Sequence, residues 1–166
     1  MSNLRRYDRP GDHVFIACKT IPQMPILVCH GNLLKNAFEY AESILDVKIE
    51  AWVILPDHFH AQLILGEIRL AQAVKRIKEK FARSFRSIVK TLSGRIWQHR
   101  YWDHIIRDED DWRRHIDYIH YNPVKHRYTD NPFNWSHSSL QEYLETGMYE
   151  QNWRCDIDIG REEFGE

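Results

Sequence analysis

The sequence predicts an α+β fold in which an antiparallel sheet carries helices on one face, a ferredoxin-like or RRM-like arrangement. Two observations lead to this prediction. Apolar residues alternate or cluster along four short segments, and they recur every three or four residues along two longer stretches between them. The resulting order is strand, helix, strand, strand, helix, strand, followed by a third helix and an irregular region. We expect the second face of this sheet to be open and to bind a ligand.

The first half of this pattern contains three strands and one helix. Residues 13–20 (HVFIACKT) are rich in strand-forming side chains, and apolar residues recur at helical spacing over 33–45. Residues 48–55 (KIEAWVIL) are apolar on both faces, which indicates a strand in the middle of the sheet. A Pro56-Asp57 turn then joins this strand to a returning strand at 58–65, forming a hairpin.

The second half shows the strongest helical signal. One apolar stripe runs from residue 70 to residue 92, and a strand is expected at 101–107. Asp108 is a suitable N-cap for a third helix, because three further acidic residues follow it at the positive end. This helix is expected to end at about Tyr121, since Pro123 disfavours helical geometry in the residue before it.

The composition is that of an ordinary globular protein. The chain has 166 residues, of which 43% are hydrophobic and 28% charged, so disorder along the whole chain is excluded. Three separated cysteines argue against a disulfide framework, and no apolar run reaches the length of a membrane span. We therefore expect a cytoplasmic protein without a membrane partner. It would have one domain over residues 1–153 and an acidic tail over 154–166.

The formal net charge of −1 conceals a strong separation of charge. Residues 69–107 hold eleven basic side chains and two acidic ones, interleaved with tryptophan and tyrosine. Such a basic and aromatic stretch is typical of nucleic-acid binding, although a basic helix face can also be merely solvated. The residues expected to contact DNA are Arg76, Lys80, Arg83 and Arg86, with Arg113 and Arg114 of the third helix as further contacts.

The hairpin carries a candidate metal site. On a strand, His58 and His60 point to the same side, together with Gln62, while the residues between them face the helices. Two imidazoles on one face can bind a divalent metal ion. A His-x-His pair is common by chance, so further ligands are needed to support this interpretation.

The third helix offers those further groups. Tyr118 and Asn122 are four residues apart, which makes them neighbours on one helix face. The Asn122 amide oxygen is a hard ligand suited to Mg²⁺ or Mn²⁺, and the Tyr118 phenol is a candidate nucleophile. A free phenol has a pKa of about 10, so a nearby cation or base must activate it. The alternative is a half-buried tyrosine followed by an Asn-Pro helix stop.

Several motifs resemble those of the REP-associated tyrosine transposases, within the HUH single-tyrosine transposases of insertion sequences. His58-Phe59-His60 matches the HUH signature, in which U is a hydrophobic residue, inside the stretch AWVILPDHFH. The stretch at 96–126, IWQHRYWDHIIRDEDDWRRHIDYIHYNPVKH, is the most similar segment. The resemblance spans roughly residues 4–153. One departure is Arg127, where the family commonly has glycine.

The resemblance implies an HUH endonuclease-type fold and a role for each candidate residue. His58, His60 and Asn122 would bind Mg²⁺ or Mn²⁺, and Tyr118 would form a covalent bond to a DNA 5′-phosphate. The substrate would be single-stranded DNA whose imperfect palindromes form hairpins, processed in DNA transposition or at REP elements. Both a monomer and a homodimer are compatible with the resemblance.

Two alternative functions remain open from the residues alone. A non-catalytic domain that binds single-stranded DNA or RNA would use the basic helix and the aromatic residues without needing the histidine pair. A metal-dependent phosphodiesterase would use an activated water, leaving Tyr118 with a structural role. Only a tyrosine nucleophile would leave protein covalently attached to DNA.

Overall fold

A computed structural model describes residues 8–21, 24–90 and 93–155, and it confirms the predicted ferredoxin-like unit. Its four strands form an antiparallel sheet in the order β2-β3-β1-β4. The elements of this unit are β1 (His13–Lys19), α1 (Gly31–Ile44), β2 (Val47–Ile54), β3 (His58–Leu65), α2 (Leu70–Ile88) and β4 (Trp102–Ile105). A short 3-10 turn, Val28–His30, precedes α1.

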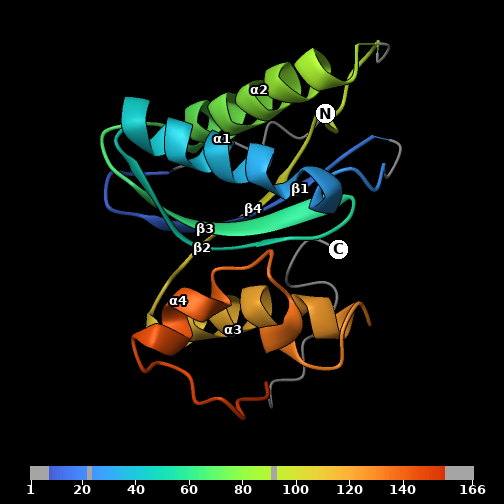
Figure 1. The fold of residues 1–166 in the computed structure, drawn as a ribbon. Helices are drawn as coiled ribbons and strands as arrows, with labels where there is room; N and C mark the ends of the chain where they lie inside the picture. Colours follow the sequence, from blue (N-terminus) through green and yellow to red (C-terminus); the bar gives the residue numbers. More distant parts are fainter. Residues whose placement is uncertain (1–7, 22–23, 91–92, 156–166) are drawn as a thin grey trace.

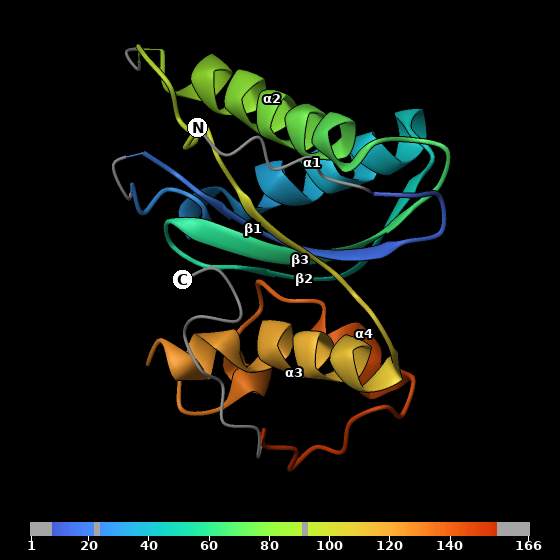
Figure 2. The ribbon, with the colours of Figure 1, turned by 180° about the vertical axis from the view of Figure 1, so that it is seen from behind.

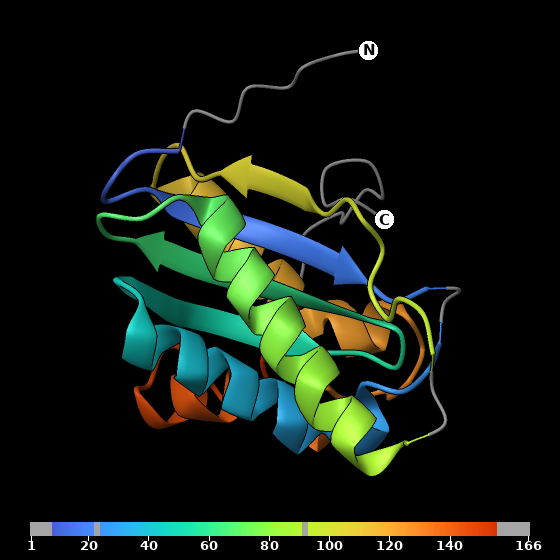
Figure 3. The ribbon, with the colours of Figure 1, turned by 90° about the horizontal axis from the view of Figure 1, so that it is seen from above.

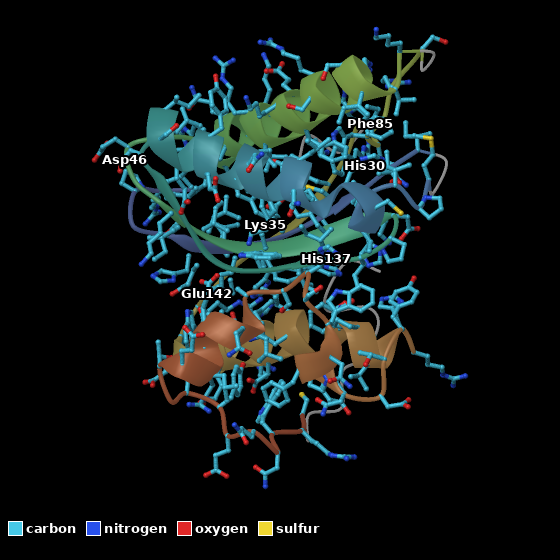
Figure 4. The ribbon with its side chains drawn as sticks, in the orientation of Figure 1. His30, Lys35, Asp46, Phe85, His137 and Glu142 are labelled. Carbon is cyan, nitrogen blue, oxygen red and sulfur yellow. The ribbon has the colours of Figure 1, made fainter. Side chains whose placement is uncertain are left out.

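Helices α1 and α2 lie side by side on one face of the sheet, as predicted (Figures 1 and 3). The apolar stripe of α2 packs onto Phe59, Ala61 and Leu63 of β3, and all of these residues are buried. At the start of α1, His30 packs edge-on against Phe85 of α2 with ring centres 4.9 Å apart (Figure 4). Burial of this continuous apolar layer is the main force that holds the unit together.

The second face of the sheet is covered, so the expectation of an open face is wrong. Helix α3 (Glu109–Lys125) and helix α4 (Leu140–Glu145) lie on this face, opposite α1 and α2 (Figures 1 and 2). The physical reason is a second apolar cluster, in which Phe15 and Val53 of the sheet pack against Ile119 of α3. Leaving these residues in water would cost about 2 kcal/mol for each large apolar side chain.

Strand β2 lies at the edge of the sheet, and the prediction of a central position is wrong. Both of its faces are nevertheless buried, because Trp52 packs in the α1 layer and Val53 in the α3 layer. The segment 137–139 pairs with its outer edge. The backbone N–H of Ile54 donates to the His137 carbonyl at 2.8 Å, and that of Trp52 donates to Ser139 Oγ at 2.9 Å. This pairing satisfies the polar groups that an edge strand otherwise exposes.

Helix α3 continues past Pro123 to Lys125, so its predicted end at Tyr121 is wrong. Proline removes only one backbone donor, and helical hydrogen bonding continues beyond it, since the N–H of His126 donates to the Asn122 carbonyl at 3.0 Å. Tyr118, Asn122 and Pro123 are all buried, so packing of the helix against the sheet outweighs the lost hydrogen bond.

Other boundaries also differ from the predictions. Helix α2 ends at Ile88 rather than at residue 92, which lies outside the described residues, and β4 is shorter than 101–107. Most of the expected acidic tail, residues 156–166, also lies outside the described part of the chain. After α3 comes a further 3-10 turn, Pro132–Asn134. In the parts of the chain that the structure describes, no helix has the length and apolar character needed to span a bilayer.

Candidate active site

Strand β3 places His58 and His60 on the face of the sheet that α3 covers. Their side chains are buried, with 5% of His58 and none of His60 exposed, and their ring centres lie 5.1 Å apart. Gln62 continues the same row, while Phe59 and Ala61 point toward α1 and α2. The alternation of a strand therefore produces the predicted pair.

Helix α3 brings the other predicted residues to this pair. The ring of Tyr118 lies 5.2 Å from that of His60, and two turns later the ring of His126 lies 5.2 Å from that of His58. Asn122 lies one turn from each of these residues and is fully buried. Because Tyr118 and His126 both contact the histidine pair, the same face of α3 directs Asn122 toward it. The four predicted residues of the metal and nucleophile site thus lie together.

This arrangement fits a divalent metal ion. Nε2 of His58, both ring nitrogens of His60 and the Asn122 side-chain oxygen are all buried on the facing surfaces of β3 and α3. Two imidazole nitrogens and one amide oxygen are common ligands of divalent metals, and three protein ligands leave positions for a substrate oxygen.

Asp57, which the sequence indicates only as a turn residue, orients one of these histidines. Its Oδ1 lies 2.7 Å from Nδ1 of His58. This hydrogen bond lowers the pKa of the Asp57 carboxyl, so the group is a carboxylate at neutral pH. With the proton on Nδ1 in that bond, Nε2 keeps the lone pair that a metal requires. In the sequence, the only indication of this role was that Asp57 directly precedes His58.

Lys125 is a second residue that sequence reasoning missed. Its Nζ donates a hydrogen bond to the phenol oxygen of Tyr118 at 3.3 Å and lies 4.6 Å from the centre of the Tyr118 ring. A cation at this position stabilises negative charge that develops on the phenol oxygen. Since Lys125 follows Pro123, the pair forms only because α3 continues past the proline.

The basic residues of α2 are not brought to this site. Arg76, Arg83 and Arg86 are exposed on α2, and Lys80 lies over the ring of Tyr40 with its Nζ 4.8 Å from the ring centre. Because α2 and α3 lie on opposite faces, the sheet separates these residues from Tyr118 (Figure 2). Arg113 and Arg114 are exposed on α3, on the same side of the sheet as Tyr118.

A second group of metal-ligand side chains lies at the other end of α3. His104, Asp111 and His115 offer ligand atoms within 4.8 Å of one another and could hold a metal ion. Asp111 also accepts hydrogen bonds from His104 Nε2 at 2.7 Å and from the Arg107 N–H at 3.0 Å, which tie β4 to the first turn of α3. The only signal in the sequence was the four-residue spacing of Asp111 and His115 on a helix.

The electrostatics of this group follow from burial and hydrogen bonding. Burial opposes ionisation of Asp111, yet the hydrogen bond from His104 holds the pKa of the carboxyl below its ordinary value. Burial also lowers the pKa of His115, which favours a neutral imidazole. An ionised carboxylate and a neutral imidazole are the protonation states that bind metals.

Comparison with known proteins identifies the family of this chain. The family model for IS200-like transposases matches residues 13–122. A candidate REP-associated tyrosine transposase of Haemophilus influenzae is 30% identical, over 96% of this chain and 97% of its own length. The REP-associated tyrosine transposase of Escherichia coli is also 30% identical, over 95% of this chain and 93% of its own.

A solved structure is similar over the whole chain. It is a REP-associated tyrosine transposase bound to a REP hairpin, with a TM-score of 0.88 and 30% identity, and the match covers 100% of this chain and 98% of that one. The family match and the group formed by His104, Asp111 and His115 both fit a divalent metal ion. The chain belongs to the IS200-like transposase family and, within it, to the REP-associated tyrosine transposases.

Proposed function

We propose that this transposase cleaves and rejoins single-stranded DNA through a covalent bond between Tyr118 and a 5′-phosphate. The observation that carries the proposal is the contact between Tyr118 and the histidine pair, with ring centres of Tyr118 and His60 at 5.2 Å. A water-activating phosphodiesterase would not need a tyrosine, with a lysine bonded to its oxygen, beside its metal ligands.

The reaction is a pair of exchanges at phosphorus. The Tyr118 oxygen, which accepts a hydrogen bond from Lys125, gives up its proton and attacks the scissile phosphate, and a new O–P bond forms as the bond to the 3′-oxygen breaks. The leaving oxygen takes a proton and becomes a free 3′-hydroxyl. Attack by a 3′-hydroxyl on the phosphotyrosine reverses these steps and joins two DNA ends without ATP, because the phosphodiester energy is conserved.

His58, His60 and Asn122 are the proposed metal ligands, and the hard amide oxygen favours Mg²⁺ or Mn²⁺. A metal ion bound there would polarise the scissile phosphate. The buried position of these residues between β3 and α3 keeps them in place and limits access of water. Asp57 holds the His58 ring in the orientation that binding requires.

The proposed substrate is single-stranded DNA containing an imperfect palindrome folded into a hairpin. A similar solved structure contains a REP hairpin, and that supports the same class of substrate here. Arg113 and Arg114 lie on the catalytic side of the sheet. Arg76, Lys80, Arg83 and Arg86 would contact DNA that passes around the sheet edge to α2. We expect the protein to act in the bacterial cytoplasm, as a monomer or a homodimer.

The proposal is tested by incubating the protein with hairpin DNA from the palindromes that flank its gene and Mn²⁺, followed by denaturing electrophoresis. We expect a DNA-linked protein band from the wild type and from Tyr121→Phe, and none from Tyr118→Phe, which lacks only a hydroxyl. Tyr121 is a matched control, because it packs on Trp153 rather than on the histidine pair.

Each other outcome points to a different function. An adduct that persists in Tyr118→Phe and disappears in Tyr121→Phe would contradict the proposed nucleophile. Cleavage by the wild type without any adduct would indicate hydrolysis by water. Binding without cleavage would indicate a non-catalytic nucleic-acid-binding domain.

A further inference from the structure

A series of aromatic rings runs from the histidine pair to the surface. His126 contacts His58 at 5.2 Å between ring centres, Tyr128 lies nearly parallel to His126 at 5.7 Å, and Trp135 nearly parallel to Tyr128 at 5.6 Å. Exposure rises from 5% for His58 to 44% for Tyr128, and Trp135 beyond it is half-buried. A buried catalytic group is thereby connected to an exposed aromatic surface.

The three outer rings are offset rather than fully overlapped. Ring centres 5.6 Å apart in nearly parallel planes exceed the roughly 3.5 to 4 Å of direct contact between stacked atoms, so Tyr128 and Trp135 overlap only in part. Trp135 is held in position because its indole N–H donates to the Ile54 carbonyl at 3.0 Å. The result is an aromatic surface whose most exposed ring is that of Tyr128.

The residue between His126 and Tyr128 has a strained backbone. Arg127 has φ of 60° and is the only non-glycine residue with positive φ in the described part of the chain. It occupies the position after the helix where glycine is preferred, as the hydrogen bond from the Tyr128 N–H to the Pro123 carbonyl at 2.9 Å shows. A long cationic side chain is thus kept at a position that disfavours it.

We propose that Arg127, Tyr128 and Trp135 form a subsite for the unpaired nucleotides that flank the scissile phosphate, a role that rests on the proposed function. A base stacks on the exposed part of the Tyr128 ring, beside Trp135, and the exposed Arg127 guanidinium contacts the adjacent phosphate.

Single-stranded DNA is favoured over other ligands by the combination of groups. Stacked aromatic rings beside a cation match a base beside a phosphate, which is the repeating unit of a single strand. Base-paired DNA could not use the rings, since its bases are already stacked. The aromatic series also ends at the proposed metal ligand His58, so a strand lying on it leads its backbone directly to the catalytic groups.

Arg127→Gly separates a structural role from a binding role. Glycine removes the left-handed strain, so we expect a melting temperature at or above that of the wild type. We also expect weaker binding of hairpin DNA with an eight-nucleotide single-stranded flank, and a salt dependence reduced by about one ion. Unchanged binding and salt dependence would show that Arg127 contacts no phosphate.

Tyr128→Ala tests the stacking role on two probes, the same flanked hairpin and a blunt hairpin. Loss of one stacked base predicts a roughly 5- to 100-fold weaker affinity for the flanked probe and no change for the blunt one. Tyr128→Phe keeps the ring and should bind like the wild type. An equal loss on both probes, or no loss on either, would overturn the subsite.

These measurements remain informative if the proposed chemistry fails. All binding is measured in the Tyr118→Phe background, in which no covalent adduct is expected. A flank-selective loss in Tyr128→Ala supports the subsite even if the wild type forms no adduct. An adduct in the wild type without flank-selective loss leaves the proposed function intact and refutes the subsite.

Discussion

The ammonium group of Lys125 lies 3.3 Å from the phenol oxygen of Tyr118, two turns earlier on the same helix. The pair places a positive charge at the atom that is proposed to attack DNA. This pair depends on the continuation of α3 past Pro123, because a helix that ended at Tyr121 would not hold Lys125 over the tyrosine ring.

Replacing Lys125 with methionine should slow formation of the covalent adduct about 10- to 1,000-fold, because a neighbouring opposite charge favours an ionised group by about one to three pKa units. Methionine keeps much of the length and apolar stem of lysine, so the fold should be preserved. Lys125→Arg, which keeps the charge, should retain more activity. The rate is measured in single-turnover reactions, and a wild-type rate in Lys125→Met would contradict the role of the cation.

Asp57→Asn should weaken Mn²⁺ binding about 10- to 100-fold, the usual effect of losing a group that orients a metal-binding histidine. His60→Ala removes a proposed ligand and should abolish both tight binding and cleavage. Titration calorimetry with Mn²⁺ measures both affinities. His104→Ala is the control for the second histidine group, and if it alone reduces Mn²⁺ binding, the ion lies at the other end of α3.

Neutralising Arg76 and Arg83 together as glutamines should reduce the salt dependence of hairpin binding by about two ions, if DNA reaches α2. The rate of cleavage at saturating DNA should stay unchanged, because the sheet separates α2 from Tyr118 (Figure 2). Arg113→Gln provides the comparison on the catalytic side. A reduced slope for Arg113→Gln alone would place the DNA along α3 only.

Stability should fall on acidification because of His120. Burial lowers the pKa of this imidazole to about 3, and its ring nitrogens are bonded to Tyr149 Oη at 3.1 Å and Ser139 Oγ at 2.9 Å. Between pH 6.5 and pH 3 the unfolded chain binds a proton at His120 that the folded chain does not, so the free energy of unfolding decreases as pH falls. The expected slope from this group is about 1.4 kcal/mol per pH unit.

His120→Gln should therefore be less stable than the wild type at pH 7.5, and the difference should shrink toward pH 4.5. Chemical denaturation at several pH values measures both free energies. Asp117, whose pKa is raised by burial, accepts a hydrogen bond from the same Tyr149 hydroxyl at 2.7 Å and is present in both proteins. Parallel pH profiles for the two proteins would show that His120 does not titrate on unfolding.

Features set by local periodicity were predictable from the sequence. Alternation along 58–65 placed His58 and His60 on one face, and the four-residue spacing placed Tyr118 beside Asn122. The βαββαβ order and the faces of α1 and α2 followed from the same patterns. The end of α3 was not predictable. Pro123 disfavours helical geometry only in its immediate neighbourhood, whereas the packing that outweighs this effect involves the whole helix.

What lies on the second face of the sheet was decided only by the tertiary structure. Periodicity shows which residues share a face of their own strand or helix, but not which other element packs on that face. Burial of Phe15 and Val53 against Ile119 brings α3 across the sheet and so brings Tyr118 to His60. The hydrophobic effect is non-directional, so an apolar face is stabilised by any apolar surface that covers it. Which element covers each face therefore depends on the whole set of long-range contacts.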